Sequence, residues 1–208
     1  MEFFSNINNL FFIIAYFIGG VPFGLILAKV FAKVDIKNSG SKSIGATNVL
    51  RVVKEKDPIL AKKLAIATIF LDAFKGFAVL SVAKFMGLPD ATLWAIAILS
   101  VVGHCFSPYL MFEGGKGVAT GVGVLFFMLP KVTIIALVVW FILGKTLKIS
   151  SLASLGALGT LVIASYVIYP EIPNIYSHAP IWIIAIIVTY KHMPNIIRLL
   201  TGQEKQVV

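Results

Sequence analysis

Charged residues are scarce in this chain. Only 13% of its 208 residues are Asp, Glu, Lys or Arg, whereas 59% are hydrophobic, and the mean hydropathy is +0.95. Soluble domains carry roughly 25% charged and 45–50% apolar residues. The composition therefore excludes an ordinary soluble domain. It predicts an all-α integral membrane protein whose residues 1–208 form a single domain.

Acidic residues and cysteine are the rarest reactive groups. The nine acidic residues include four aspartates, which are too scattered to hold Mg²⁺, and Cys105 is the single cysteine. One cysteine excludes an internal disulfide and a cysteine metal cluster. We therefore expect no metal and no cofactor. The 18 Lys and Arg residues give a formal charge of +9, which in a membrane protein is typical of loops beside anionic lipid and not of a nucleic-acid surface.

Common nucleophile and nucleotide motifs are also missing. The chain contains no G-x-S-x-G elbow and no histidine followed five residues later by aspartate. The segment "FEGGKGVATG" does not fit a nucleotide-binding P-loop, because Leu110 stands five residues before Gly115 and Gly117 follows Lys116. An acyl-enzyme serine and a nucleotide site are therefore not expected.

Long apolar runs predict the membrane-crossing helices, since about 20 apolar residues span a bilayer. The run 118–143 contains Pro130 and Lys131, and a single span would leave Lys131 near the bilayer centre at roughly 2.5–3.5 kcal/mol. Two helices that meet at this point avoid that cost. The sequence thus predicts a polytopic bundle of about seven transmembrane helices, at 10–31, 64–84, 91–111, 118–143 (two helices), 152–169 and 181–200.

The basic residues predict how this bundle is oriented. The N-terminal segment has no basic residue before the first apolar run, which argues against a signal peptide. We expect seven spans, with the N-terminus outside (periplasmic) and the C-terminus cytoplasmic. This arrangement places every Lys and Arg on the cytoplasmic side except Lys75, Lys84 and Lys131. This is the expected positive-inside bias.

Two glycine-containing polar segments then fall at the cytoplasmic face. In "FEGGKGVATG", Gly114, Gly115 and Gly117 let backbone N–H groups approach a ligand, and Lys116 adds a positive charge. In "NSGSKSIGATNVLR", Thr47 and Asn48 are candidate helix N-caps, and Arg51 lies one turn further along. Both segments are suited to binding an anion, although the second is equally consistent with an ordinary capped loop.

Four further groups of polar residues belong to the same face. Asp72 and Lys75 are three residues apart within an apolar helix and can pair, as a structural ion pair or beside a substrate. His192, Asn195 and Arg198 share one face of the last helix. His104 precedes the glycine loop, and the segment "SSLAS" offers a hydroxyl donor at Ser151.

Three long motifs in order, "GSKSIGATNVLR", "GHCFSPYLMFEGGKGVATGVG" and "HMPNIIRLLTGQE", resemble the PlsY-type acyl-phosphate–glycerol-3-phosphate acyltransferases of bacterial inner membranes. "DAFKG" and "SSLAS" resemble shorter signatures of that family. The resemblance implies seven spans, a cell inner membrane location and an active site at the cytoplasmic face. It also implies transfer of a fatty acyl group from acyl phosphate to the 1-hydroxyl of sn-glycerol 3-phosphate, giving lysophosphatidate, without an acyl-enzyme intermediate.

The resemblance also implies roles for individual residues. Acyl phosphate is an activated anhydride, so a substrate phosphate is the expected base, and His192 is the alternative base. The expected catalytic residues are Ser41, Arg51, Lys116, His192 and Asn195. The expected substrate- or phosphate-binding residues are Gly40, Thr47, Asn48, Gly114, Gly115, Gly117 and Ser151, and the supporting residues are Asp72, Lys75, His104, Arg198 and Glu204.

The sequence departs from this family pattern at three places. Lys42 and Ser43 stand where the family usually has Gly-Asn, Glu113 where it has Lys or Arg, and Met193 where it commonly has Arg.

A membrane transporter of a small phosphate ester is the alternative function. Transporters often show internal repeats and midplane binding groups, whereas here the polar groups gather at one face and no repeat is visible. A purely structural membrane subunit leaves the glycine–lysine loop unexplained.

Overall fold

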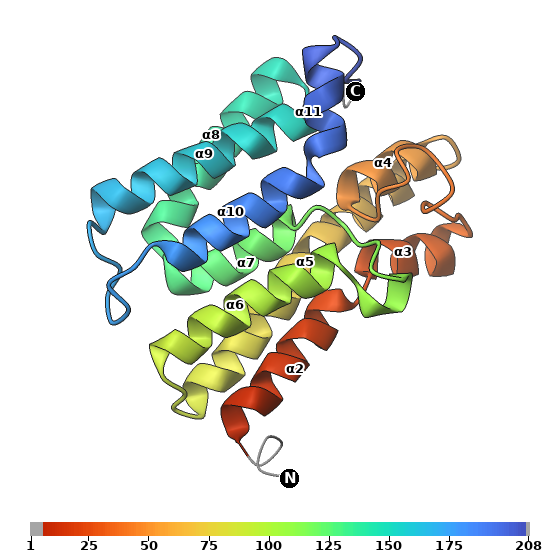
Figure 1. Cartoon of the computed structure of the whole chain (residues 1–208). Helices are drawn as coiled ribbons and strands as arrows, with labels where there is room; N and C mark the ends of the chain where they lie inside the picture. The colour runs from red at the N-terminus through yellow and green to blue at the C-terminus, as the bar shows by residue number, and fades with distance from the viewer. Residues whose placement is uncertain (1–5, 207–208) are drawn as a thin grey trace.

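The computed structural model describes residues 6–206, and all regular elements among these residues are helical. Figure 1 shows them as a bundle of long helices with shorter helices at one end. The elements are α2 (Ile7–Gly20), α3 (Phe23–Leu27), η1 (Ala28–Ala32), α4 (Ala46–Lys54), α5 (Pro58–Phe85), α6 (Asp90–Cys105), η2 (Pro108–Leu110), α7 (Val118–Met128), α8 (Pro130–Leu147), α9 (Ser150–Ile168), α10 (Ala179–Lys191) and α11 (Met193–Leu200).

Five helical segments are long and apolar enough to cross a membrane, which agrees with the predicted polytopic protein. They are 7–32, 58–85, 90–110, 130–147 and 150–168. A sixth crossing is possible if α10 and α11, which meet at a bend of 59°, count as one span. The apolar helix α7 has only 11 residues, and at 1.5 Å per residue it is shorter than the hydrocarbon core of a bilayer.

Proline residues explain the two main interruptions. Pro22 separates α2 from α3, and Pro130 is the first residue of α8, one residue beyond the end of α7. A proline has no N–H to donate and is tolerated in the first turn of a helix but not in its interior. The expected division of segment 118–143 at Pro130 is confirmed, although α8 continues to Leu147.

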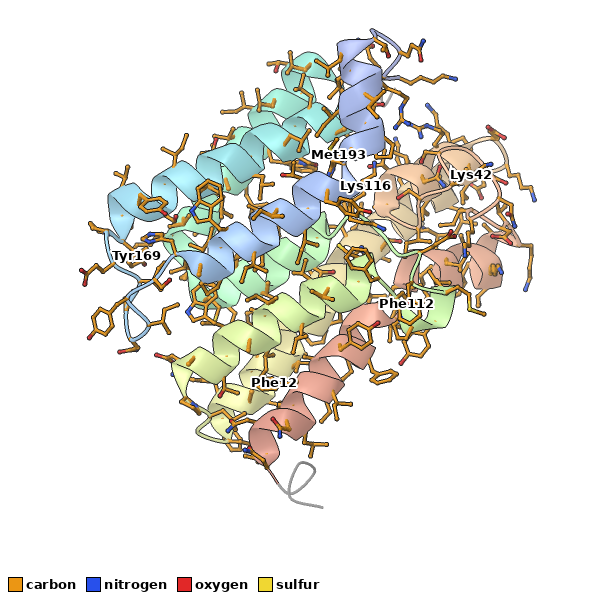
Figure 2. The ribbon with its side chains drawn as sticks, viewed as in Figure 1. Phe12, Lys42, Phe112, Lys116, Tyr169 and Met193 are labelled. Carbon is orange, nitrogen blue, oxygen red and sulfur yellow. The ribbon has the colours of Figure 1, made fainter. Side chains whose placement is uncertain are left out.

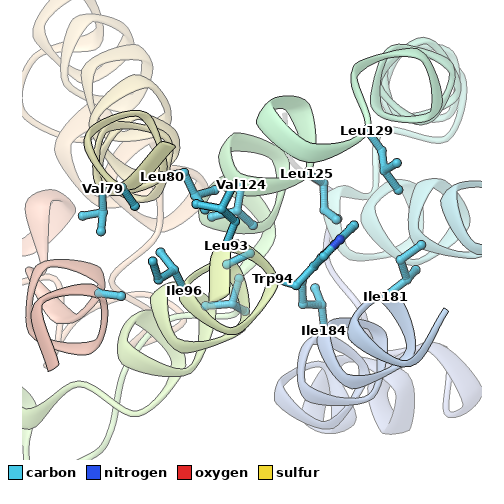
Figure 3. Close-up of a cluster of buried hydrophobic side chains, with 14 of the residues drawn as sticks. Val79, Leu80, Leu93, Trp94, Ile96, Val124, Leu125, Leu129, Ile181 and Ile184 are labelled. Atoms are coloured by element: carbon cyan, nitrogen blue, oxygen red, sulfur yellow. The ribbon is translucent and has the colours of Figure 1, made fainter. Parts of the chain in front are cut away.

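The main hydrophobic core lies between α2, α5, α6, α7 and α10, and α8 and α9 add buried side chains to it. Figure 3 shows Leu80, Ile96 and Val124 converging from α5, α6 and α7, with Ile184 of α10 beside Trp94 of α6. Glycines allow close helix crossings, because a Cβ on Gly123 of α7 would lie only 1.9 Å from the carbonyl oxygen of Ala73 on α5. Small residues at such crossings are the usual means of helix packing in membranes.

The two short amphipathic helices α4 and α11 lie at the same end of the bundle as the C-terminal end of the chain, and the N-terminal end lies at the opposite end (Figure 1). The loop before α4 and the segment after α11 therefore meet the ends of the long helices. This arrangement gathers the polar segments of the sequence into one region.

Candidate active site

A cavity of about 670 Å³ opens where the polar segments meet. Its polar end is lined by the loop before α4, the start of α7, the start of α9, the α10–α11 junction and residues 203–205. Its other end is walled by apolar side chains of α5, α7, α8, α9 and α10. In Figure 2, Lys116 lies at the polar end, close to α10 and α4, whereas Tyr169 lies at the far end of the molecule.

Most of the predicted site residues line this single cavity. They are Gly40, Ser41, Thr47, Asn48, Arg51, Asp72, His104, Lys116, Gly117, Ser151, His192, Asn195, Arg198 and Glu204. Gly114, Gly115 and Lys75 are not part of the lining. The sequence motifs thus named a set of residues that the fold brings to one cavity from distant parts of the chain.

The N-terminus of α4 is one of the cavity's polar walls. The helix begins at Ala46, and Gly45 is its N-cap without a side-chain cap. The expected capping by Thr47 or Asn48 is therefore wrong, because both residues lie inside the first turn. Within residues 6–206, the N–H groups of Ala46 and Thr47 form no hydrogen bond, and such free groups at a helix start attract anions.

Asn48 organises the loop before α4. Its Nδ2 contacts the carbonyl oxygens of Ile36, Ser39 and Ser43 at 2.8–3.1 Å, and its Oδ1 accepts from the N–H of Ser41 at 2.8 Å. Its amide is thus engaged by the loop backbone, and because Asn48 also lines the cavity, its role in substrate binding stays a prediction. Its contact with Ser41 positions that residue at the cavity.

The glycine loop presents fewer N–H groups than its sequence suggests. The N–H groups of Gly114 and Gly115 donate to the carbonyl oxygens of Cys105 and His104 at 3.1 and 2.9 Å, so the expected ligand contacts by these two groups are corrected. Gly117 has φ +81°, a left-handed conformation that favours glycine, and starts α7. In the described part of the chain, no hydrogen bond uses the N–H groups of Lys116 or Gly117.

Arg51 and Lys116 are two cations that line the polar end without a partner. In the part of the chain that the structure describes, neither forms an ion pair or a side-chain hydrogen bond. Burial lowers the pKa of Lys116 to about 8; the nearby Glu204 carboxylate opposes this shift, and the positive charges of Arg198 and Arg51 add to it. Two unpaired cations beside two uncapped helix N-termini form a strong site for a phosphate group.

Glu204 folds back into the same region from the segment after α11. Its carboxylate accepts hydrogen bonds from Ser151 Oγ at 2.7 Å, Asn195 Nδ2 at 2.5 Å and Arg198 Nε at 2.6 Å. Burial acts to raise the pKa of Glu204, but these three donors and the charge of Arg198 outweigh it and lower the pKa. Glu204 therefore joins α9, α11 and the segment after α11 around the cavity.

His192 lies at the bend between α10 and α11. Its Nδ1 is 2.7 Å from the carbonyl oxygen of Val188, and because a carbonyl oxygen can only accept, Nδ1 carries the proton. The side chain is 2% exposed. When the ring is neutral, its Nε2 atom is therefore an acceptor.

Some lining residues had no signal in the sequence that distinguished them. Ser150 is bound to Thr47 through their hydroxyl groups at 3.1 Å, which links α9 to α4, and it could be recognised only as a neighbour of Ser151. Thr133 and Trp140 of α8 line the apolar end without belonging to any motif.

Glu113 is 3.4 Å from Lys37 in an exposed ion pair outside the cavity lining, so this departure from the family pattern does not change the cavity wall.

Comparisons with known proteins agree with this site. Residues 9–202 match the model of a family described as glycerol-3-phosphate acyltransferase. The chain belongs to the glycerol-3-phosphate acyltransferase family. The resemblance inferred from the three motifs is thereby confirmed.

Relatives that carry this family name match along their whole length. The glycerol-3-phosphate acyltransferase of a Nitratiruptor species is 63% identical over 207 residues, which cover 100% of this chain and 99% of the relative. That of Sulfurimonas denitrificans is 61% identical over 208 residues and is covered completely, as is this chain.

Solved structures of the family have the same fold. The crystal structure of PlsY (YgiH), an integral membrane glycerol 3-phosphate acyltransferase, in its glycerol 3-phosphate form is 32% identical with a TM-score of 0.83, and the match covers 97% of this chain and 96% of that one. The lysophosphatidic acid form is 33% identical with a TM-score of 0.79, and the match covers 97% and 95%. The fold of this chain is thus that of an integral membrane acyltransferase family.

Proposed function

We propose that this protein transfers a fatty acyl group from acyl phosphate to the 1-hydroxyl of sn-glycerol 3-phosphate, releasing lysophosphatidate and phosphate. One observation carries the proposal: a single cavity has two unpaired cations, Arg51 and Lys116, at one end and an apolar wall at the other. The polar end suits a small phosphate ester, and the apolar wall suits an acyl chain. Family membership makes these two ligands substrates of one reaction.

The reaction needs no nucleophile from the protein. Acyl phosphate has an activated carbonyl and phosphate as its leaving group, so direct attack by the glycerol hydroxyl completes the transfer. The proton of that hydroxyl passes to a substrate phosphate. The part of the protein is to hold both phosphates, align the reacting atoms and stabilise the developing oxyanion. Ser41, Thr47, Arg51 and Lys116 are the groups proposed to do this.

His192 is the alternative base. Its Nδ1 donates to the carbonyl oxygen of Val188, which leaves the Nε2 lone pair free to accept a proton. The geometry is therefore compatible with a protein base. The substrate phosphate remains the simpler candidate, because it lies in the reaction centre by necessity.

The proposed placement is a bacterial inner membrane with seven crossings, a periplasmic N-terminus and the site at the cytoplasmic face. The distribution of basic residues supports this orientation, since Arg51, Lys116 and Arg198 all lie at the polar end of the cavity. The short helix α7 and the bent pair α10–α11 would provide the two crossings beyond the five long helical segments.

The test is acyl transfer by the purified protein to labelled glycerol 3-phosphate. Palmitoyl phosphate, palmitoyl-CoA and palmitoyl carrier protein are offered separately, with Lys116→Ala and Lys116→Arg as matched variants. The proposal expects lysophosphatidate from palmitoyl phosphate alone, a loss of about 10²–10³-fold in Lys116→Ala, and partial activity in Lys116→Arg. Product from palmitoyl-CoA or carrier protein would overturn the donor assignment, and no product from any donor would leave transport of a phosphate ester as the next function to test.

A further inference from the structure

A buried network connects the membrane interior to the glycine loop. The ammonium Nζ of Lys75 lies 2.8 Å from Asp72 Oδ1, 2.9 Å from the carbonyl oxygen of Val21 and 2.9 Å from His104 Nδ1. Lys75 and Asp72 are each 3% exposed, and His104 is 4% exposed. An ammonium group has three protons and no lone pair. Lys75 therefore donates one proton to each of its three partners.

This arrangement fixes the tautomer of His104. Because Lys75 donates to Nδ1, that atom must be an acceptor, and the ring proton of a neutral imidazole then lies on Nε2. Asp72 cannot compete for Nδ1, since its Oδ1 is 3.7 Å away, beyond hydrogen-bonding distance. The ring is held firmly, because Lys75 is anchored at two other points.

The Nε2 atom of His104 lies beside the loop that carries Lys116. A Cβ placed on Gly115 would be 2.2 Å from this atom, so the glycine is required for the loop to pass the ring. His104 lines the cavity. In the described part of the chain, no group hydrogen-bonds its Nε2. A nearly buried N–H donor without a partner thus stands at the cavity wall next to Lys116.

We propose that His104 is a substrate-binding donor: its Nε2–H hydrogen-bonds a phosphoryl oxygen of the substrate whose charge Lys116 neutralises. This inference rests on the proposed acyl transfer and extends it, because the sequence assigned His104 only a supporting role. His104 and His192 then have opposite functions in one cavity. Lys75 makes His104 a permanent donor, and the Val188 carbonyl makes His192 an acceptor.

Two matched substitutions separate binding from a purely structural role. In His104→Gln the side-chain amide can place an N–H near the former position of Nε2. In His104→Asn the amide oxygen can replace Nδ1 as the acceptor for Lys75, but the shorter side chain brings no donor to the cavity. Lost hydrogen bonds to charged groups cost about 1.5–3 kcal/mol, a factor of roughly 10–150. We expect His104→Asn to raise KM for one phosphate substrate about tenfold or more, and His104→Gln to stay within about threefold of the parent protein.

Separate KM values for glycerol 3-phosphate and palmitoyl phosphate show which phosphoryl group His104 contacts. The inference is overturned if His104→Asn binds both substrates normally, or if His104→Gln is the weaker binder. Since the parent protein is assayed alongside, failure of the proposed function is visible separately, as absence of product from the unsubstituted protein.

A spectroscopic measurement on the unsubstituted protein covers the case in which a variant does not fold. The chain has three histidines, so ¹⁵N-histidine spectra contain few signals. We expect the His104 ring to be protonated at Nε2 only, with its signal assigned by its loss in either His104 variant that folds or by its shift in Lys75→Met. Its Nε2–H resonance should shift when glycerol 3-phosphate or palmitoyl phosphate is added. An Nδ1-protonated His104, or a resonance that neither substrate shifts, would disprove the inference.

Discussion

At the scale of single residues, the site depends on which polar groups are already paired within the protein. Asn48, Gly114 and Gly115 were expected at the ligand, but their hydrogen-bonding groups are used by neighbouring backbone. Arg51 and Lys116 remain unpaired within residues 6–206. The type of a residue can be read from the sequence, whereas its partner depends on a chain segment that is distant in sequence. This is why the sequence could group residues that line one cavity but could not assign their hydrogen-bond partners.

Lys116 gives the site a pH dependence. Its pKa is lowered to about 8 by burial, so the free protein loses this cation as the pH rises through that value. We expect KM for glycerol 3-phosphate to increase above pH 8, by about tenfold per pH unit at most. Lys116→Arg should lack this increase, because a guanidinium stays charged beyond pH 12. KM measured from pH 6.5 to 9.5 for both proteins tests the prediction, and an identical alkaline increase in Lys116→Arg would contradict it.

The same shift has the opposite effect on folding. The pKa of Lys116 is lower in the folded protein than its ordinary value of 10.5, so the folded state binds fewer protons between pH 8 and 10.5. The contribution of this residue therefore destabilises the fold below pH 8, and the penalty diminishes as the pH rises toward 10.5. Binding and stability thus change in opposite directions, which distinguishes loss of the cation from general alkaline unfolding.

His192 offers a direct test of where the hydroxyl proton goes. If a substrate phosphate is the base, His192→Ala should keep kcat within about tenfold while lowering thermal stability, because the ring's buried hydrogen bond to Val188 is lost. If His192 is the base, kcat should fall by about 10²–10⁴-fold. Single-turnover rates with palmitoyl phosphate, together with thermal unfolding in detergent, separate these outcomes.

At the scale of secondary-structure elements, most helices were predictable, but their ends were not. The apolar runs and Pro130 indicate correctly where α7 and α8 divide. The first span, in contrast, contains a break at Pro22 followed by the π-helix η1, and the last contains the 59° bend. Hydropathy reports whether a segment suits lipid. It does not report how the helix end packs against its neighbours.

The crossing of α5 and α7 is a sensitive contact between elements. We expect Gly123→Ala to lower the free energy of unfolding by about 1–3 kcal/mol, since the added methyl group would meet the Ala73 carbonyl oxygen at 1.9 Å. Gly159→Ala in α9 is the matched control, because nothing lies within 4 Å of its added methyl group. That variant should be neutral or gain at most about 1 kcal/mol. Equal thermal stabilities of the two variants in detergent would refute the proposed crossing.

At the scale of the whole molecule, the orientation in the membrane is the main open prediction. The buried Cys105 is the single cysteine, so single introduced cysteines can be labelled with little background. In intact cells, a membrane-impermeant maleimide should label Tyr176→Cys but not Lys33→Cys or Lys148→Cys. Permeabilised cells should give labelling of all three. Labelling of Lys148→Cys in intact cells would overturn the seven-span orientation and favour an even number of crossings before α9.

The cavity also has a consequence for how the enzyme's kinetics must be described. In the proposed reaction its polar end admits a solute from water, whereas its apolar wall, to which Leu137 and Trp140 of α8 and Ile69 and Ala73 of α5 contribute, receives a chain dissolved in the bilayer. The two substrates then have concentrations in different phases. If inert lipid is added while the total amount of acyl donor is kept constant, the donor's concentration within the membrane falls and the reaction should slow. The same addition should leave KM for glycerol 3-phosphate unchanged. Detergent alkyl chains, for the same reason, should act as competitive inhibitors with respect to the donor.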